Sequence, residues 1–271
     1  AGRGVLKAFA ELLPLPDAGL AMKLMVQAGI LQWLLPEFGA AMHQVPDDGA
    51  HELTIGAHSV QAVELLEGFR NGDDPDLREA WAGISDPGVL LLAVLLHDIG
   101  KTQDKTSHCE AGAKTAAKTA ERLGLRPDSI RTLEFLVRSH LVMSETARLR
   151  DLSDQRTAQD FIGIINSREL LDMIYLLTAA DVQSVGQKTW SEVQMRFLRE
   201  LYHRASNLMR RSAPADVDLG RHRSRLAREL SLANLPQSEV DEHCGAMPAA
   251  YLLNTSADDL AVHIEYVRKA R

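Results

Sequence analysis

An unbroken apolar run from Val89 to Leu96 ends directly in His97 and Asp98, and this junction constrains the fold more than any other feature of the chain. A carboxylate and an imidazole at the end of a buried segment leave water only if a partner compensates for the lost hydration. A divalent metal ion is such a partner, because the carboxylate supplies negative charge and the imidazole a neutral nitrogen ligand. The alternative is a surface aspartate beside a histidine that caps the last carbonyl groups of a helix.

The composition of the chain excludes several classes of protein. With 271 residues and 45% apolar content, the chain can bury a sizeable core. Its net charge of −7 argues against a nucleic-acid partner, which would favour a basic face. The apolar runs are too short for a membrane span and no secretory signal is evident, so we expect a cytoplasmic protein with no membrane partner. The two cysteines, Cys109 and Cys244, lie far apart and suit a reducing compartment.

Strand patterns are nearly absent, and the abundance of Leu, Ala, Glu, Arg and Met predicts an all-α fold. We expect helices over residues 6–13, 20–35, 53–69, 76–81, from 87 onward, 110–123, 127–141, 153–165, 169–181, 191–209, 221–233, 238–244 and from 256 onward. Helix-breaking residues divide the chain into entry helices over 1–50, a main domain over 51–211 and a C-terminal helical extension over 212–271.

Helical spacing places two further ionisable side chains on the core-facing side of their helices. His58 follows Ile55 by three residues, and Asp181 follows Leu177 by four. Each such group taken alone is more often a satisfied core residue than a ligand. Together with the histidine–aspartate pair they predict a catalytic metal site, because three or four nitrogen and oxygen ligands with open positions are typical of catalytic metals.

Four more residues are candidates for the same site. His140 continues an apolar helical row, and His108 opens the helix after the loop that follows Lys101. We expect both histidines to contact substrate or support the ligands, whereas His51 is either such a group or an ordinary loop histidine. Lys101 can reach an anionic substrate oxygen at the metal, the alternative being a solvated lysine that complements the helix dipole.

The order of these ligands in a helical chain resembles the HD superfamily of metal-dependent phosphohydrolases. Further segments are similar to the HD domain of the bifunctional PII uridylyltransferase/uridylyl-removing enzymes, namely 51–60, 96–101, 107–113, 136–144, 146–147, 150–154, 170–181, 190 and 198–202. Segment 36–39 resembles the entry helices of that family, and segment 247–256 resembles the stretch that precedes its ACT domains. The resemblance covers nearly the whole chain and identifies it as the central, uridylyl-removing module. It implies an HD helical bundle with extra N- and C-terminal helices, and flanking nucleotidyltransferase and ACT domains in a longer protein. One departure is Gly56, where the family often has an acidic residue.

The resemblance also implies a mechanism. One divalent ion (Mn, Fe, Zn or Mg) would be held by His58, His97, Asp98 and Asp181, and a second ion, bridged by Asp98, could use His108 and His140. Asp98 and Lys101 would be the catalytic residues, and the substrate would be a uridylylated tyrosine of a PII-type signalling protein, with UMP as product. Two alternatives stay open. One is an HD phosphohydrolase that acts on a free nucleotide, and the other is a regulatory module that binds metal or nucleotide without turnover.

Overall fold

The computed structural model of the chain describes residues 2–45, 53–103, 107–185, 192–212, 226, 230, 235–247, 251–252, 255 and 257–270. Within these residues the regular structure is entirely helical, which confirms the all-α prediction. The chain divides into two compact units, Ala1–Leu208 and Met209–Arg271, and each is considered by itself. The finer division at residues 50 and 211 stays a prediction.

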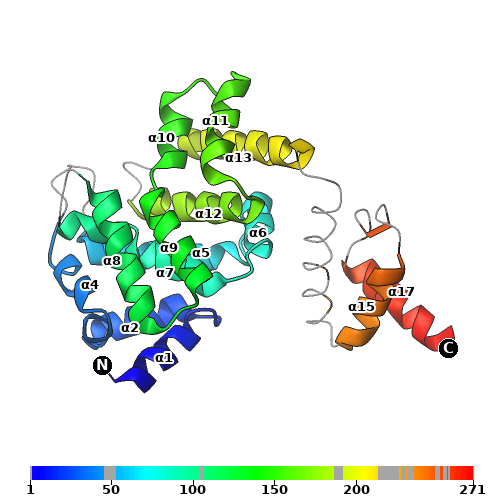
Figure 1. Cartoon of the computed structure of the whole chain (residues 1–271), viewed down its shortest axis with the longest axis horizontal. Coiled ribbons are helices and arrows are strands. Elements are labelled where there is room, and N and C mark those ends of the chain that lie inside the picture. The colour runs from blue at the N-terminus through cyan, green and yellow to red at the C-terminus, as the bar shows by residue number, and fades with distance from the viewer. Residues whose placement is uncertain are drawn as a thin grey trace. The chain divides into compact units, whose positions relative to one another are not determined.

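The helices of the first unit are mostly short to medium in length (Figure 1). Their bounds are α1 Arg3–Leu12, α2 Ala18–Gln27, α3 Leu31–Leu34, α4 Pro36–Ala41, α5 Ile55–Phe69, α6 Pro75–Ala82, α7 Pro87–Leu96, the 3₁₀ helix η1 Ile99–Thr102, α8 His108–Leu123, α9 Pro127–Arg138, α10 Val142–Leu149, α11 Gln155–Ile165, α12 Arg168–Ser184 and α13 Glu192–Ser212, whose last four residues fall in the second unit.

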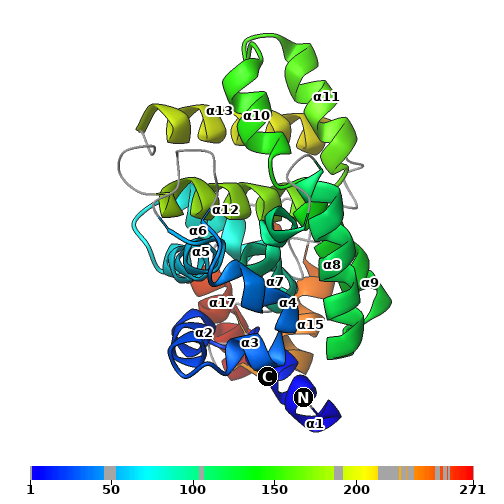
Figure 2. The ribbon, with the colours of Figure 1, turned by 90° about the vertical axis from the view of Figure 1, so that its left-hand side faces the viewer.

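Helix α7 is the central element of this unit. Pro87 occupies its first turn, and the side chain of Asp86 accepts a hydrogen bond from the backbone N–H of Val89 at 3.3 Å, which caps the helix. Every residue from Gly88 to Leu96 is buried. A helix that is apolar all round must be surrounded, and α5, α9 and α12 pack against α7 (Figures 1 and 2). The polar pair at its C-terminal end is therefore delivered to the interior of the bundle.

Helix α12 brings a second polar group to the same region. Ser167 caps it by accepting a hydrogen bond from the N–H of Leu170 at 3.2 Å. Residues 171–180 are all buried, and the helix packs against α5, α6 and α7. Because α5, α7 and α12 contact one another pairwise, ionisable residues on their facing sides meet inside the bundle.

Two expectations about the helices were wrong. The single helix expected over 20–35 is divided into α2 and α3, because Gly29 adopts φ +68°, outside the helical region, and Pro36 then begins α4. The helix expected over 127–141 ends at Arg138, and the following α10 was not predicted. The helix expected over 221–233 lies largely outside the described residues.

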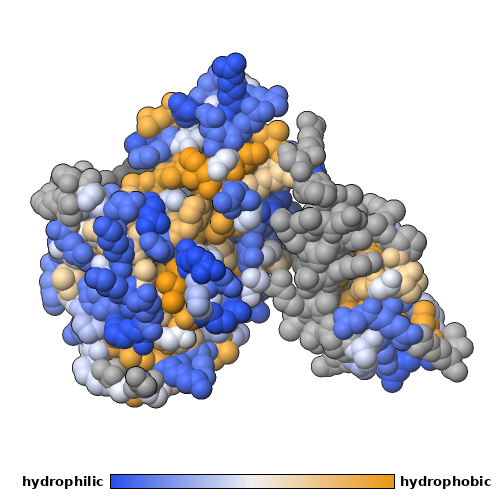
Figure 3. All heavy atoms as spheres, viewed as in Figure 1, coloured by the Kyte–Doolittle hydropathy of each residue, from blue (hydrophilic) through white to orange (hydrophobic). Residues whose placement is uncertain are grey.

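The surface of the first unit is mixed. Figure 3 shows hydrophobic residues gathered around α12 and α13, with hydrophilic residues over α8 and α9. Among the described residues no single helix is long and apolar enough to span a membrane, and the one helix pair that reaches that length and composition together, Pro75–Ala82 and Pro87–Thr102, is bent by 117°.

The second unit contains helices α15, Gln237–Ala246, and α17, Ala257–Ala270. These helices contact each other around a separate small core. Its buried members are Leu226, Leu230, Val240, Cys244, Leu252, Leu260 and Ile264.

Candidate metal centre

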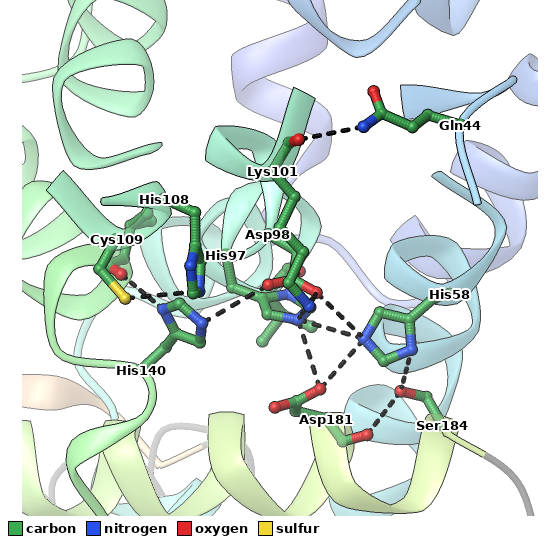
Figure 4. A network of polar contacts seen from close by, with 12 residues as sticks. Gln44, His58, His97, Asp98, Lys101, His108, Cys109, His140, Asp181 and Ser184 are labelled. Atoms are coloured by element: carbon green, nitrogen blue, oxygen red, sulfur yellow. Dashed lines mark hydrogen bonds and ion pairs between the residues drawn. The ribbon is translucent and has the colours of Figure 1, made fainter. Parts of the chain in front are cut away.

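Three ligand atoms from three helices converge at the end of α7 (Figure 4). His58 Nε2 lies 3.2 Å from His97 Nε2 and 3.0 Å from Asp181 Oδ1, and the distance from His97 Nε2 to Asp181 Oδ1 is 3.4 Å. Both imidazoles are buried, whereas the Asp181 side chain is 17% exposed. The group therefore lies in the interior but has access to solvent on the carboxylate side.

Hydrogen bonds fix which nitrogen of each imidazole carries the proton. His97 Nδ1 lies 2.8 Å from the carbonyl oxygen of Val94, which can only accept, so Nδ1 donates. Ser184 Oγ donates to the carbonyl oxygen of Asp181 at 2.7 Å and therefore accepts from His58 Nδ1, 3.0 Å away. In the neutral form of both histidines, Nε2 then presents its lone pair to the carboxylate of Asp181.

This donor set fits a metal cation. Two facing imidazole lone pairs and a carboxylate repel one another unless positive charge lies between them. Donor atoms that share one cation with bonds of about 2.1 Å lie about 3.0 Å apart in octahedral and about 3.4 Å apart in tetrahedral geometry. The separations between His58, His97 and Asp181 fall in this range.

Asp98 lies between this group and a second one. Its Oδ2 is 3.6 Å from His97 Nε2 and 3.9 Å from His58 Nε2, and accepts a hydrogen bond from Lys101 Nζ at 2.6 Å. Its Oδ1 is 3.5 Å from His140 Nε2. The two oxygens of one buried carboxylate therefore face in different directions, as a bridging ligand requires (Figure 4).

The second group comprises His108, Cys109 and His140, whose ligand atoms all lie within 4.8 Å of one another. His140 Nδ1 donates to the carbonyl oxygen of Val137 at 2.7 Å, so in the neutral form of this histidine Nε2 presents a lone pair as well. That Nε2 is buried and makes no hydrogen bond of normal geometry to any described residue. The rings of His140 and His108 are edge-to-face, with centroids 5.6 Å apart.

The electrostatics of the centre favour positive charge. Burial alone would raise the pKa of Asp181, but His97 and His58 hold that pKa far below its usual value. Burial would also raise the pKa of Asp98, but His97, His140 and Lys101 hold that pKa well below its usual range. Burial would lower the pKa of His140, yet its interactions with Asp98 and Cys109 raise it to about 10. The pKa values of His97 and His140 are raised, so protons on these two imidazoles balance the two carboxylates in the chain alone, and a metal ion would compete with these protons.

The structure thus brings together most of the residues that the sequence indicated, and their roles stay predictions. The residues in the cluster are His58, His97, Asp98, Lys101, His108, His140 and Asp181. His51 lies outside the described residues. Sequence reasoning missed Cys109, adjacent to His108, and Ser184, one helical turn after Asp181, although both spacings were readable. It also missed Gln44, whose Nε2 donates to the carbonyl oxygen of Lys101 at 3.1 Å.

The cluster of candidate ligands lies in a segment that matches a known protein family. Residues 50–181 match the family model of the HD domain. The segment runs from just before α5 to Asp181, so it contains every ligand candidate named above. The match confirms the resemblance to the HD domain.

Several bacterial proteins named bifunctional uridylyltransferase/uridylyl-removing enzyme are similar to nearly the whole chain. The protein of Azospirillum brasilense is 33% identical over 260 residues, that of Rhodospirillum rubrum 33% over 262, and that of Caulobacter vibrioides 34% over 260. These matches cover 93%, 94% and 92% of this chain but 27% of each relative. The chain therefore spans about a quarter of the length of the curated relatives it matches.

The structure also explains the departure at Gly56 within the HD domain. A Cβ atom at this position would lie 2.6 Å from Met42 Sδ and 3.1 Å from Met42 Cα. The residue after α4 therefore occupies the space that a side chain at position 56 would need, and an acidic group does not fit there without a shift of that backbone.

Proposed function

We propose that this chain hydrolyses a phosphodiester with the aid of a divalent cation bound by His58, His97, Asp98 and Asp181. One observation carries the proposal: the lone-pair nitrogens of two buried histidines, held by their Nδ1 hydrogen bonds, converge on the carboxylate of Asp181. When bound, such a cation supplies an activated water and polarises a phosphoryl oxygen.

In the same proposal, Lys101 supplies positive charge beside the metal ligands, where the phosphoryl group of the substrate would lie. Its ammonium group is 2.6 Å from Asp98 Oδ2, and its side chain is 21% exposed, so it lies between the interior and solvent. The backbone at this position is held by the bond from Lys101 N–H to the Asp98 carbonyl at 3.0 Å and by the bond from Gln44. A fixed ammonium at this place would stabilise the negative charge that develops on the phosphoryl oxygens.

The substrate we propose is a uridylylated tyrosine of a PII-type protein, from which UMP is released. The names of the relatives support this choice, because each is a uridylyl-removing enzyme. A tyrosyl phosphodiester has a phenolate leaving group, which needs less help from a general acid than an alkoxide does. In the same proposal, nucleotidyltransferase and ACT domains flank this module in a longer protein.

The first experiment tests for hydrolysis. With added Mn²⁺, the chain should hydrolyse bis-p-nitrophenyl phosphate, and Asp98→Ala should reduce the rate by at least about 100-fold. Asp160→Ala is the matched control, since this aspartate on α11 is 66% exposed and pairs with Arg150. Equal rates for the unmodified chain and Asp98→Ala would reject every enzymatic proposal. A bound metal without turnover would instead favour a binding module.

The second experiment separates the substrates. Incubation with uridylylated PII should release UMP, whereas free nucleoside phosphates should stay intact. Cleavage of free nucleotides with no release from PII would favour the alternative HD phosphohydrolase.

A further inference from the structure

Cys109 lies inside the cluster and has no role in the function proposed so far. It is the second residue of α8, directly after His108, and its Sγ lies 3.5 Å from His108 Nε2. Nitrogen and sulfur ligands of one tetrahedral ion, with bonds of about 2.1 and 2.3 Å, lie about 3.6 Å apart. The observed separation therefore already matches that of two ligands on one metal.

His140 supplies an independent indication, because its buried ring faces the same cluster and its Nε2 approaches Asp98 Oδ1 no closer than 3.5 Å. It is 1% exposed, and its Nε2 has no hydrogen bond of normal geometry among the described residues. A ring nitrogen of His140 lies within 4.8 Å of the Cys109 sulfur and of a His108 nitrogen, and His140 Nε2 lies 3.5 Å from Asp98 Oδ1.

We propose that Cys109 is a thiolate ligand of a second cation, together with His108 and His140. On binding, the thiol would release its proton to solvent and the sulfur would coordinate the ion. Thiolate and imidazole ligands select Zn²⁺, Co²⁺ or Fe²⁺, and they disfavour Mg²⁺ and Ca²⁺, which prefer oxygen ligands. The inference rests on the proposed function for its consequence in hydrolysis, but metal binding can be measured without turnover.

Cobalt spectroscopy tests the thiolate ligand directly. The metal-free chain, kept reduced with a phosphine, is titrated with Co²⁺, and the near-ultraviolet thiolate-to-cobalt charge-transfer band is recorded. The unmodified chain and Cys244→Ser should show this band, whereas Cys109→Ser should lose it. Cys244 is a matched control because it is the other cysteine of the chain and lies in the second unit. A band that is absent from the unmodified chain, or that survives in Cys109→Ser, would overturn the proposal.

A second measurement needs no variant and so does not depend on how Cys109→Ser folds. Zn²⁺ should slow the alkylation of half-buried Cys109 at least about tenfold, as determined by peptide mass spectrometry, while Mg²⁺ should not. Alkylation of Cys109 at the same rate with and without Zn²⁺ contradicts the proposal. Hydrolysis of bis-p-nitrophenyl phosphate by the same samples separates the two claims. A cobalt band without hydrolysis removes only the enzymatic function, and hydrolysis without a band removes only the thiolate site.

Discussion

His58 Nε2 lies 3.0 Å from Asp181 Oδ1, although 123 positions separate the two residues in the chain. The contact exists because α5 and α12 pack side by side, with the end of α7 against both. Ligands that come from separate helices depend on the packing of those helices and on the hydrogen bonds that orient each ring.

Ser184→Ala should weaken metal binding without unfolding the chain. The hydroxyl accepts from His58 Nδ1 and so keeps the lone pair of Nε2 directed at Asp181. Loss of such an orienting partner lowers metal affinity by about 10- to 100-fold. Isothermal titration with Mn²⁺ measures the effect. Ser144→Ala is the matched control, because Ser144 also donates to the carbonyl three residues earlier, that of Leu141. Equal affinities in both variants would show that Ser184 does not orient the ring.

Lys101→Met should slow hydrolysis by about 100-fold and leave the metal content unchanged, because the variant loses a charge that acts on the transition state. Rate and metal-to-chain ratio are measured on the same samples. Lys118→Met serves as the control, since Lys118 on α8 is exposed. Should the metal content of Lys101→Met fall in parallel with the rate, the role of Lys101 would be to position Asp98 instead.

Gly100→Ala should destabilise the fold by about 3 kcal/mol, because the added methyl group would overlap the backbone where η1 crosses α8. A Cβ atom here would meet the carbonyl of His108 and lie 2.6 Å from Gly112 N. Gly163→Ala on α11 should have the opposite effect, because no neighbouring atom lies within 4 Å of the added Cβ position. There the free energy of unfolding should rise by about 0.5–1 kcal/mol. Urea denaturation of both variants provides the comparison, and two equal destabilisations would contradict the close approach at Gly100.

Asp172 should lower the free energy of unfolding as the pH rises, which is the reverse of the usual effect of a carboxylate. Burial raises the pKa of this carboxyl to about 6, although Arg168 and Tyr202 donate hydrogen bonds to it. The protonated form therefore stabilises the fold below about pH 4, the ordinary range of the group, and this contribution is lost as the pH rises through about 6. The loss amounts to about 3 kcal/mol.

Comparison with Asp172→Asn isolates this contribution from the other carboxylates. The free energy of unfolding of the unmodified chain, minus that of the variant, should decrease between about pH 4 and pH 7. A difference that stays constant across this range would show that the carboxyl of Asp172 titrates alike in the folded and unfolded chain.

The sequence by itself determined the helical class and the candidates for the ligand set. Apolar runs and three- and four-residue spacings are local properties, and they indicated that His58, His97 and Asp181 face the core. The same local patterns could not reveal the break at Gly29 or the start of α10, because these depend on how single residues fit their neighbours.

Only the tertiary structure decided which polar atoms meet and through which partners. The role of Ser184 depends on the packing of α12 against α5, and the place of Cys109 beside His140 depends on the packing of α8 against α9. A sequence records which side of a helix a residue lies on. The distances between residues of different helices arise only when those helices pack, because a shift of one turn would move any of these atoms by about 5.4 Å.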